Sequence, residues 1–193
     1  MADDFNILDT PVSSGMPFWP GSRNLTTTGL PNAFTTTGGA YSLPVIDRLY
    51  LTPFYVPIES MTVNSVAIDI FAADIGPTVR AGLYSVDSDG LPDELLFISP
   101  VFDLSSSGER HVTLTLPVDI QGGAYYTALA STGNTTSIRR NNGFTGNFAG
   151  RNPFLLDAEG LYNTLSPGWS TFPDNPTIDG TEAIAVFTLS LVG

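Results

Sequence analysis

The sequence predicts an all-β fold, a β-sandwich of jelly-roll type, on three observations. Short apolar segments alternate with polar residues at a period of two, and turn residues separate them at intervals of about 8–12 residues. No segment shows an apolar stripe at the helical period. Hydrophobic residues make up 42% of the 193 residues and charged residues 13%, which is enough apolar material for one core.

The clearest strand pattern is that of Arg110–Leu116. Val112, Leu114 and Leu116 alternate with polar residues, so we expect them to face the core. His111 lies in the opposite phase, and its side chain should point away from the core.

Residues 63–71 and 78–84 show the same alternation. The side chains expected inward are Asn64, Val66, Ile68 and Ile70 in the first segment and Val79, Ala81 and Leu83 in the second. Arg80 should face outward. Residues 95–102 predict a further strand that Pro100 interrupts.

Proline and glycine set the limits of two other strands. Residues 48–57 predict an extended edge segment, because Pro53 and Pro57 cannot donate a hydrogen bond at a central position. Gly122–Gly123 predicts a turn, after which residues 123–130 form a strand.

The segment from residue 141 to 180 predicts a long aromatic-rich loop before the last strand. Within it, residues 158–165 contain at most a single helical turn. Residues 183–191 are apolar in both phases, which is typical of a central strand that closes the domain.

Residues 1–40 predict an extended N-terminal arm, and residues 41–193 the sandwich domain. The arm is dense in proline and glycine, which break helices and strands, yet it is too apolar for a free tail. Its candidate partner-binding residues are Phe5, Ile7, Leu8, Phe18, Trp19 and Phe34. The arm either docks on a neighbouring subunit or wraps its own domain.

The charge balance excludes several classes of partner. The formal net charge is −12, from 19 acidic residues and seven basic ones, all of them arginine. Such a surface argues against nucleic acid and anionic membranes, and no apolar run reaches the length of a membrane span. There is no cysteine, hence no disulfide or thiolate site. The acidic start, Met1–Asp4, lacks the features of a signal peptide, so we expect synthesis in a cytoplasm.

The order of several motifs resembles a known module. Phe54-Tyr55-Val56-Pro57 precedes residues 61–68, and then come residues 79–84 and the turn at 90–95. The strand at 112–116 precedes the one at 123–130. This order, over about residues 48 to 140, resembles a jelly-roll module of bacteriophage head-fibre, capsid-decoration and tail structural proteins. Carbohydrate-binding β-sandwiches share similar features.

The resemblance implies a particle-associated, often trimeric protein, and it transfers no catalytic residue. It does not extend to the arm or to residues 141–180, so it does not indicate the mode of attachment.

The sequence gives little support for a catalytic site or a metal site. Nucleophilic catalysis needs a histidine between nucleophile and acid, and the single histidine, His111, is expected to face outward. Paired carboxylates could hydrolyse sugars, but no pair is singled out, so we expect no enzyme and no cofactor. Asp87 and Asp89 are a candidate calcium site, although Leu91–Pro92 interrupts the ligand spacing and a plain turn accounts for them better.

Aromatic and amide side chains in the long loop have the composition of a sugar-binding surface. The candidate glycan-binding residues are Asn142, Phe144, Tyr162 and Trp169. Clustered aromatics also fill cores and subunit contacts, which we favour. Arg139–Arg140 could pair with an acidic neighbouring subunit or lie unpaired in a loop.

Together these observations predict a virion structural protein of capsid decoration (cement) or head-fibre type. It would lie on the virion surface and form a homo-oligomer, with a trimer favoured, and its partners would be major capsid or tail proteins. The alternative is a carbohydrate-binding, receptor-recognition module of a tail or fibre protein, whose partner would be a cell-surface glycan. A polysaccharide hydrolase ranks third.

Overall fold

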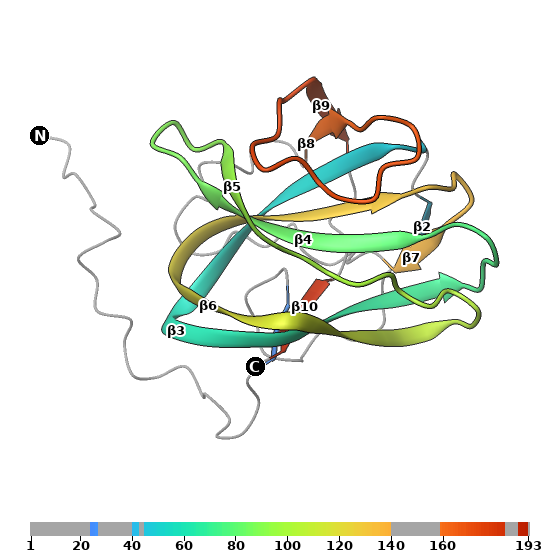
Figure 1. The fold of residues 1–193 in the computed structure, drawn as a ribbon, viewed down its shortest axis with the longest axis horizontal. Coiled ribbons are helices and arrows are strands. Elements are labelled where there is room, and N and C mark those ends of the chain that lie inside the picture. Colours follow the sequence, from blue (N-terminus) through green and yellow to red (C-terminus); the bar gives the residue numbers. More distant parts are fainter. Residues whose placement is uncertain (1–23, 27–39, 43–44, 140–158, 184–188, 193) are drawn as a thin grey trace, which may run out of the picture.

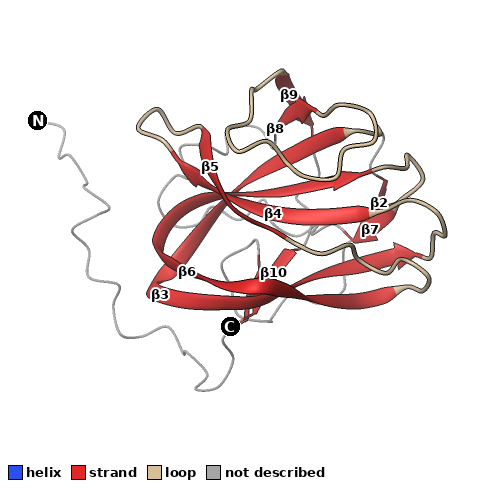
Figure 2. Ribbon diagram, viewed as in Figure 1, coloured by secondary structure: helices blue, strands red, loops and turns tan. Residues whose placement is uncertain are grey.

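The computed structural model describes residues 24–26, 40–42, 45–139, 159–183 and 189–192, and these ranges contain no helix. Their strands form one ten-stranded antiparallel sheet, which confirms the predicted all-β class (Figure 2). The strands are β1 (Asn24–Thr26), β2 (Ala40–Ser42), β3 (Arg48–Ala72), β4 (Val79–Val86), β5 (Pro92–Ile98), β6 (Gly108–Ser131), β7 (Ser137–Arg139), β8 (Glu159–Thr164), β9 (Gly180–Ala183) and β10 (Leu189–Val192).

The main path through the sheet runs β1-β10-β3-β6-β4-β5. Strands β7 and β8 also pair with β3, while β2 pairs with β7 and β9 with β8. Most pairs therefore join segments that are distant in the sequence.

The sheet curls because its two longest strands bend. β3 has 25 residues and β6 has 24, and the two pair along most of their length. Figure 1 shows both strands turning back, so that an upper half of the sheet lies over a lower half. The upper half holds residues 48–56 of β3 and 123–131 of β6, and the lower half holds residues 60–72 and 108–121.

The prediction of a turn at Gly122–Gly123 is wrong, because strand β6 continues through both glycines. The pairing shifts register between Val56 and Ser60 of β3, opposite Gly123. Gly123 has a φ of 150°, which an L side chain rarely adopts. Glycine here lets the strand bend without ending it.

An inner cluster of apolar side chains fills the space between the two halves of the sheet. The predicted inward residues Val66, Ile68 and Ile70 are buried there, as are Val79, Ala81 and Leu83 of β4. Other members are Tyr50, Val56, Met61, Val63, Phe97, Phe102, Leu104, Leu114, Ile120, Leu129, Ile138 and Leu191. The period-two pattern thus predicted the buried side chains correctly for residues 66–70 of β3 and 79–83 of β4.

Three residues depart from that pattern at one irregularity in the pairing of β3 with β6. Val63 pairs with Val118 and Ser65 with Thr113, so Asn64 alone lies opposite residues 114–117. Leu116 lies in this bulge with 75% of its surface exposed, so its predicted inward orientation is wrong. The shift also reverses the phase of β3, which buries Val63 and exposes Asn64, whose predicted inward orientation is therefore also wrong.

The predicted edge segment 48–57 is paired on both sides over part of its length. Residues 49–56 pair with β6, and Arg48–Leu51 also pair with β8. The pairing with β8 ends two residues before Pro53, which has no N–H to donate. The edge prediction is therefore wrong for residues 49–51, which pair with both β6 and β8.

The end of the chain also differs from the prediction. Residues 159–164 form strand β8, where we expected at most a helical turn. The two ends of the expected closing strand pair differently, since Ala183 of β9 pairs with β8 and Leu189–Val192 of β10 lie between β1 and β3. Both differences arise from pairing with distant strands, which local periodicity does not show.

Candidate functional site

The segment between β8 and β9, residues 165–179, lies across the outer face of the upper half (Figure 1, orange). We call this segment the strap. The strap contributes Leu165 and Phe172 to an outer cluster of buried side chains, whose other members come from the sheet: Leu49, Leu51, Tyr84, Tyr126, Ala128 and Ala130. The predicted loop thus covers a second apolar face of the sheet.

Gly82 of β4 makes room for the strap. A Cβ atom at this position would lie 3.0 Å from the ring of Phe172 and 2.9 Å from the carbonyl oxygen of Phe97. The distance to the Phe97 oxygen is closer than real Cβ contacts allow, and the distance to the Phe172 ring is tighter than nine in ten of them. The absence of a side chain therefore lets Phe172 pack directly on the strand.

Hydrogen bonds hold the strap at several points. The Tyr84 hydroxyl donates to the carbonyl oxygen of Pro173 at 2.8 Å, and the amide of Leu95 in β5 donates to Asp174 at 2.9 Å. Asn163 of β8 donates its side-chain amide to Thr177 at 2.5 Å. Burial, and to a lesser degree the charge of Asp174, raises the pKa of Tyr84 above its ordinary value. The hydroxyl therefore stays a donor at neutral pH.

Two of the glycan-binding candidates make contacts within the chain. The Arg48 guanidinium lies over the Tyr162 ring, 4.0 Å from its centre. The Trp169 ring packs against Phe172 with ring centres 5.5 Å apart, and both belong to or contact the outer cluster. Asn142 and Phe144 lie outside the described residues. Both candidate glycan-binding rings among the described residues thus stack on protein groups.

In the Asp87–Gly90 turn between β4 and β5, the Asp87 carboxylate accepts hydrogen bonds from backbone amides of the turn itself. Asp87 Oδ1 accepts hydrogen bonds from the amides of Asp89 and Leu91, at 2.8 and 2.9 Å. Gly90 has a φ of 83° and its amide donates to the Asp87 carbonyl at 3.2 Å. The turn geometry alone accounts for the Asp-Ser-Asp-Gly sequence.

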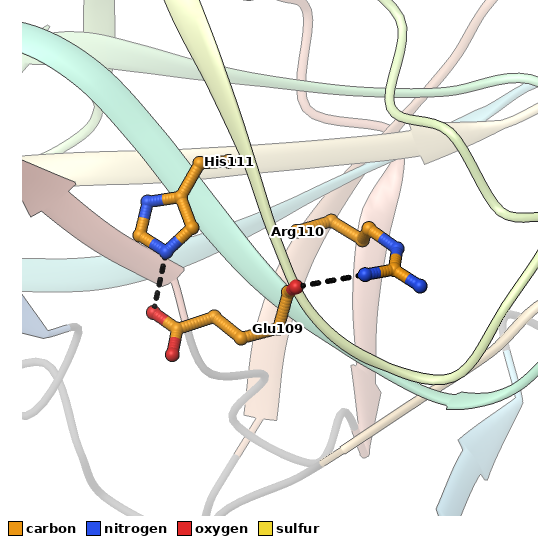
Figure 3. A network of polar contacts seen from close by, with 3 residues as sticks. All are labelled: Glu109, Arg110 and His111. Carbon is orange, nitrogen blue, oxygen red and sulfur yellow. Dashed lines mark hydrogen bonds and ion pairs between the residues drawn. The ribbon is translucent and has the colours of Figure 1, made fainter.

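His111 points away from the inner cluster, as its phase predicted, and half of its side-chain surface is exposed. Its Nε2 lies 3.0 Å from Glu109 Oε1 on the same strand (Figure 3). Arg110 projects to the other side, where it donates to the Glu109 carbonyl at 3.2 Å and to Ser106.

One feature that the sequence reasoning missed is a hollow at the end of the sheet. It lies between the β3–β4 and β5–β6 connections and has a volume of about 170 Å³. Its lining residues are Asp74, Ile75, Gly76, Pro77, Phe102, Asp103, Leu104 and Ser105. An isoleucine beside a Gly-Pro turn was the available indication, because a turn exposes its side chains.

The predicted arm is described only in part. Residues 24–26 form β1, which pairs with β10, and Ala40 begins β2, which pairs with Arg139 of β7. These short segments thus belong to the sheet. The candidate partner-binding residues lie outside the described residues, as does Arg140: Phe5, Ile7, Leu8, Phe18, Trp19 and Phe34.

Comparison with models of known protein families and with curated proteins finds no match. Among the described residues, no group of three or more His, Cys, Asp or Glu side chains is placed to hold a metal ion. The same residues include no helix long and apolar enough for a membrane span. Functional inference therefore depends on the contacts and strand order of this chain.

Proposed function

We propose that the chain is a non-enzymatic structural protein of a bacteriophage particle, of the capsid decoration or head-fibre type, with a jelly-roll-like domain. One observation carries the proposal: the segments that resemble the phage module fold together as one curled antiparallel sheet, from Arg48 to Arg139. Fold alone does not imply function, so this proposal depends on the resemblance as well as on the sheet.

The distribution of exposed groups supports a role in packing against other subunits. Large apolar side chains are exposed at separate places on the sheet and its connections: Ile46, Phe71, Ile75, Leu91, Val101 and Leu116. The charged fraction of the chain is only 13%. Single exposed apolar residues are ordinary on any surface, whereas the cores of subunit interfaces are depleted in charged residues. The low charged fraction therefore supports burial in an assembly.

Mass spectrometry of gradient-purified phage particles tests this function directly. We expect the full chain in particles that encode it, at a fixed ratio to the major capsid or tail protein. A chain found only in the soluble fraction of the lysate would overturn the proposal.

Removal of residues 1–23 tests the arm as the anchor. This cut leaves β1 intact, because β1 begins at Asn24. We expect a folded protein that no longer enters particles, and Trp19→Ser in the full chain should weaken incorporation in the same direction. Unchanged incorporation of both variants would remove the arm from the attachment mechanism.

Light-scattering mass of the purified chain, with and without EDTA, tests the oligomer. We expect a species of three times the 20.5 kDa chain mass that EDTA does not alter. A monomer would favour the carbohydrate-binding alternative, which a glycan array can then test. Dissociation by EDTA would point to a cation at Asp87 and Asp89.

A further inference from the structure

The hollow between the β3–β4 and β5–β6 connections has an apolar floor and one strongly exposed apolar side chain. Phe102 and Leu104 on its floor are 1% and 3% exposed, whereas Ile75 at its rim is 87% exposed. Ile75 leaves most of its apolar surface in water, and burial of that surface against another apolar group is favourable. Contact between Ile75 and an apolar group of another molecule would therefore be favourable.

Hydrogen bonds between the two connections fix the shape of the hollow. The amide of Asp74 donates to the Leu104 carbonyl at 2.9 Å, and Thr135 donates its hydroxyl to Asp74 Oδ2 at 2.8 Å. The amide of Phe102 donates to Val79 at 3.0 Å. A surface that is ordered before binding loses less entropy when a partner arrives.

The rim of the hollow carries two carboxylates, Asp74 and Asp103. Hydrogen bonds from the amide and side chain of Ser105 lower the pKa of Asp103 below its ordinary value. Arg110 lies within electrostatic range of Asp103, but its guanidinium also donates to Ser106 and to the Ser107 carbonyl. The hollow thus keeps a net negative rim.

Charge and size decide between the candidate occupants. A second copy placed on the same hollow would bring four carboxylates together, which is unfavourable. Pockets for small ligands usually have volumes of about 300–1,000 Å³, and this hollow has about 170 Å³. One aliphatic side chain with a cation beside it matches both the volume and the charge.

We propose that this hollow docks an aliphatic side chain of a partner protein segment that carries lysine or arginine next to it. Ile75 and the apolar floor contact the aliphatic group, and Asp74 and Asp103 attract the flanking cations. The inference does not depend on the virion assignment, and particle incorporation and peptide binding fail or succeed separately.

Titration of the labelled full chain with a short peptide tests the proposal by nitrogen–proton correlation NMR. The probe is acetyl-Gly-Lys-Leu-Lys-Gly-amide at millimolar concentration. We expect saturable shifts of the Ile75, Leu104 and Ser105 amides, and no such shifts with Lys-Ser-Lys or Glu-Leu-Glu versions. Absence of shifts, or equal shifts with the serine peptide, would overturn the proposal.

Variants locate the effect in the hollow. Ile75→Ser should weaken binding by about tenfold, because it removes most of the apolar contact at the rim. Asp103→Asn keeps an oxygen acceptor for Ser105 and should weaken binding by about threefold, an effect that salt abolishes. Leu116→Ser is the matched control, since Leu116 is also exposed but lies in the β6 bulge. A control variant that weakens binding as much as Ile75→Ser would also contradict the proposal.

Discussion

The inner and outer clusters lie on opposite faces of the same strands, yet different elements close them. In β4, Leu83 faces the inner cluster and Tyr84 the outer one. Strands of the lower half close the inner cluster, whereas the strap closes the outer one. A sheet face buried by another part of the sheet needs only apolar side chains, but a face buried by a loop must also satisfy the loop's backbone groups.

Polar contacts mark this difference. In the outer cluster the hydroxyls of Tyr84 and Tyr126 donate to carbonyl oxygens of Pro173 and Gly90. Burial raises the pKa of both hydroxyls. We therefore expect alkaline pH to destabilise the outer cluster, and we expect this cluster to open in local unfolding. The inner cluster should become exposed only when the whole domain unfolds.

The largest expected effect is that of Ile68→Ala in the inner cluster. Its side chain is 1% exposed between the two halves of the sheet, so the cavity should lower the free energy of unfolding by about 4 kcal/mol. Urea denaturation measures this loss. Leu116→Ala is the control, with an expected loss below about 0.5 kcal/mol; equal losses would contradict the assigned burial.

Phe172→Ala in the outer cluster should lower the free energy of unfolding by about 3 kcal/mol. The loss is smaller than in the inner cluster because the strap can partly collapse into the space. Hydrogen exchange should accelerate at the amide of Leu95, which donates to Asp174 of the strap. The amide of Ser99, which donates to Ala81, should stay protected as an internal control. Uniform acceleration at both amides would mean that the two clusters unfold together.

Tyr84→Phe removes the donor to Pro173 and should lower the free energy of unfolding by about 1 kcal/mol at neutral pH. The pKa of Tyr84 is raised in the folded protein above the unfolded value of about 10. Its stabilisation is thus complete below about pH 10 and is lost as the pH rises further.

Thermal unfolding across this alkaline range measures the effect. The native chain should lose stability above about pH 10, and the Tyr84→Phe variant should lose less. Parallel curves for the two proteins would show that other groups govern alkaline unfolding.

The smallest expected effect is that of His111→Gln, which removes the pair with Glu109 outside both clusters. Both side chains are about half exposed, so the change should stay below about 0.5 kcal/mol. Unfolding at low and high salt checks this. A loss above about 1 kcal/mol would indicate that His111 has a structural role beyond this exposed pair.

Alternation of apolar and polar residues was sufficient to predict which side chains are buried where a strand keeps its phase. It predicted the buried faces of residues 66–70 and 79–83 and the outward position of His111. It failed for Val63, Asn64 and Leu116, because the bulge opposite Asn64 reverses the phase within a continuous strand. A bulge depends on the pairing of two distant strands, so one strand's sequence does not reveal it.

The candidate sites follow the same rule. The sequence indicated the Asp87 turn, whose hydrogen bonds are local. It placed Tyr162 and Trp169 in one aromatic loop but not on Arg48 and Phe172. The turn at Gly76–Pro77 indicated an exposed Ile75, but the hollow itself could not be predicted, because Asp74 and Asp103 come from separate connections that only the folded chain brings together.

By itself the sequence determined the all-β class, the faces of the regular strands and the turn at Asp87, because all of these follow from side-chain alternation and backbone preferences of neighbouring residues. Tertiary structure alone decided the curl of the sheet, the strand at residues 159–164, the strap and the hollow. Each of these depends on hydrogen bonds and burial between segments far apart in the chain, whose free energy no local pattern contains.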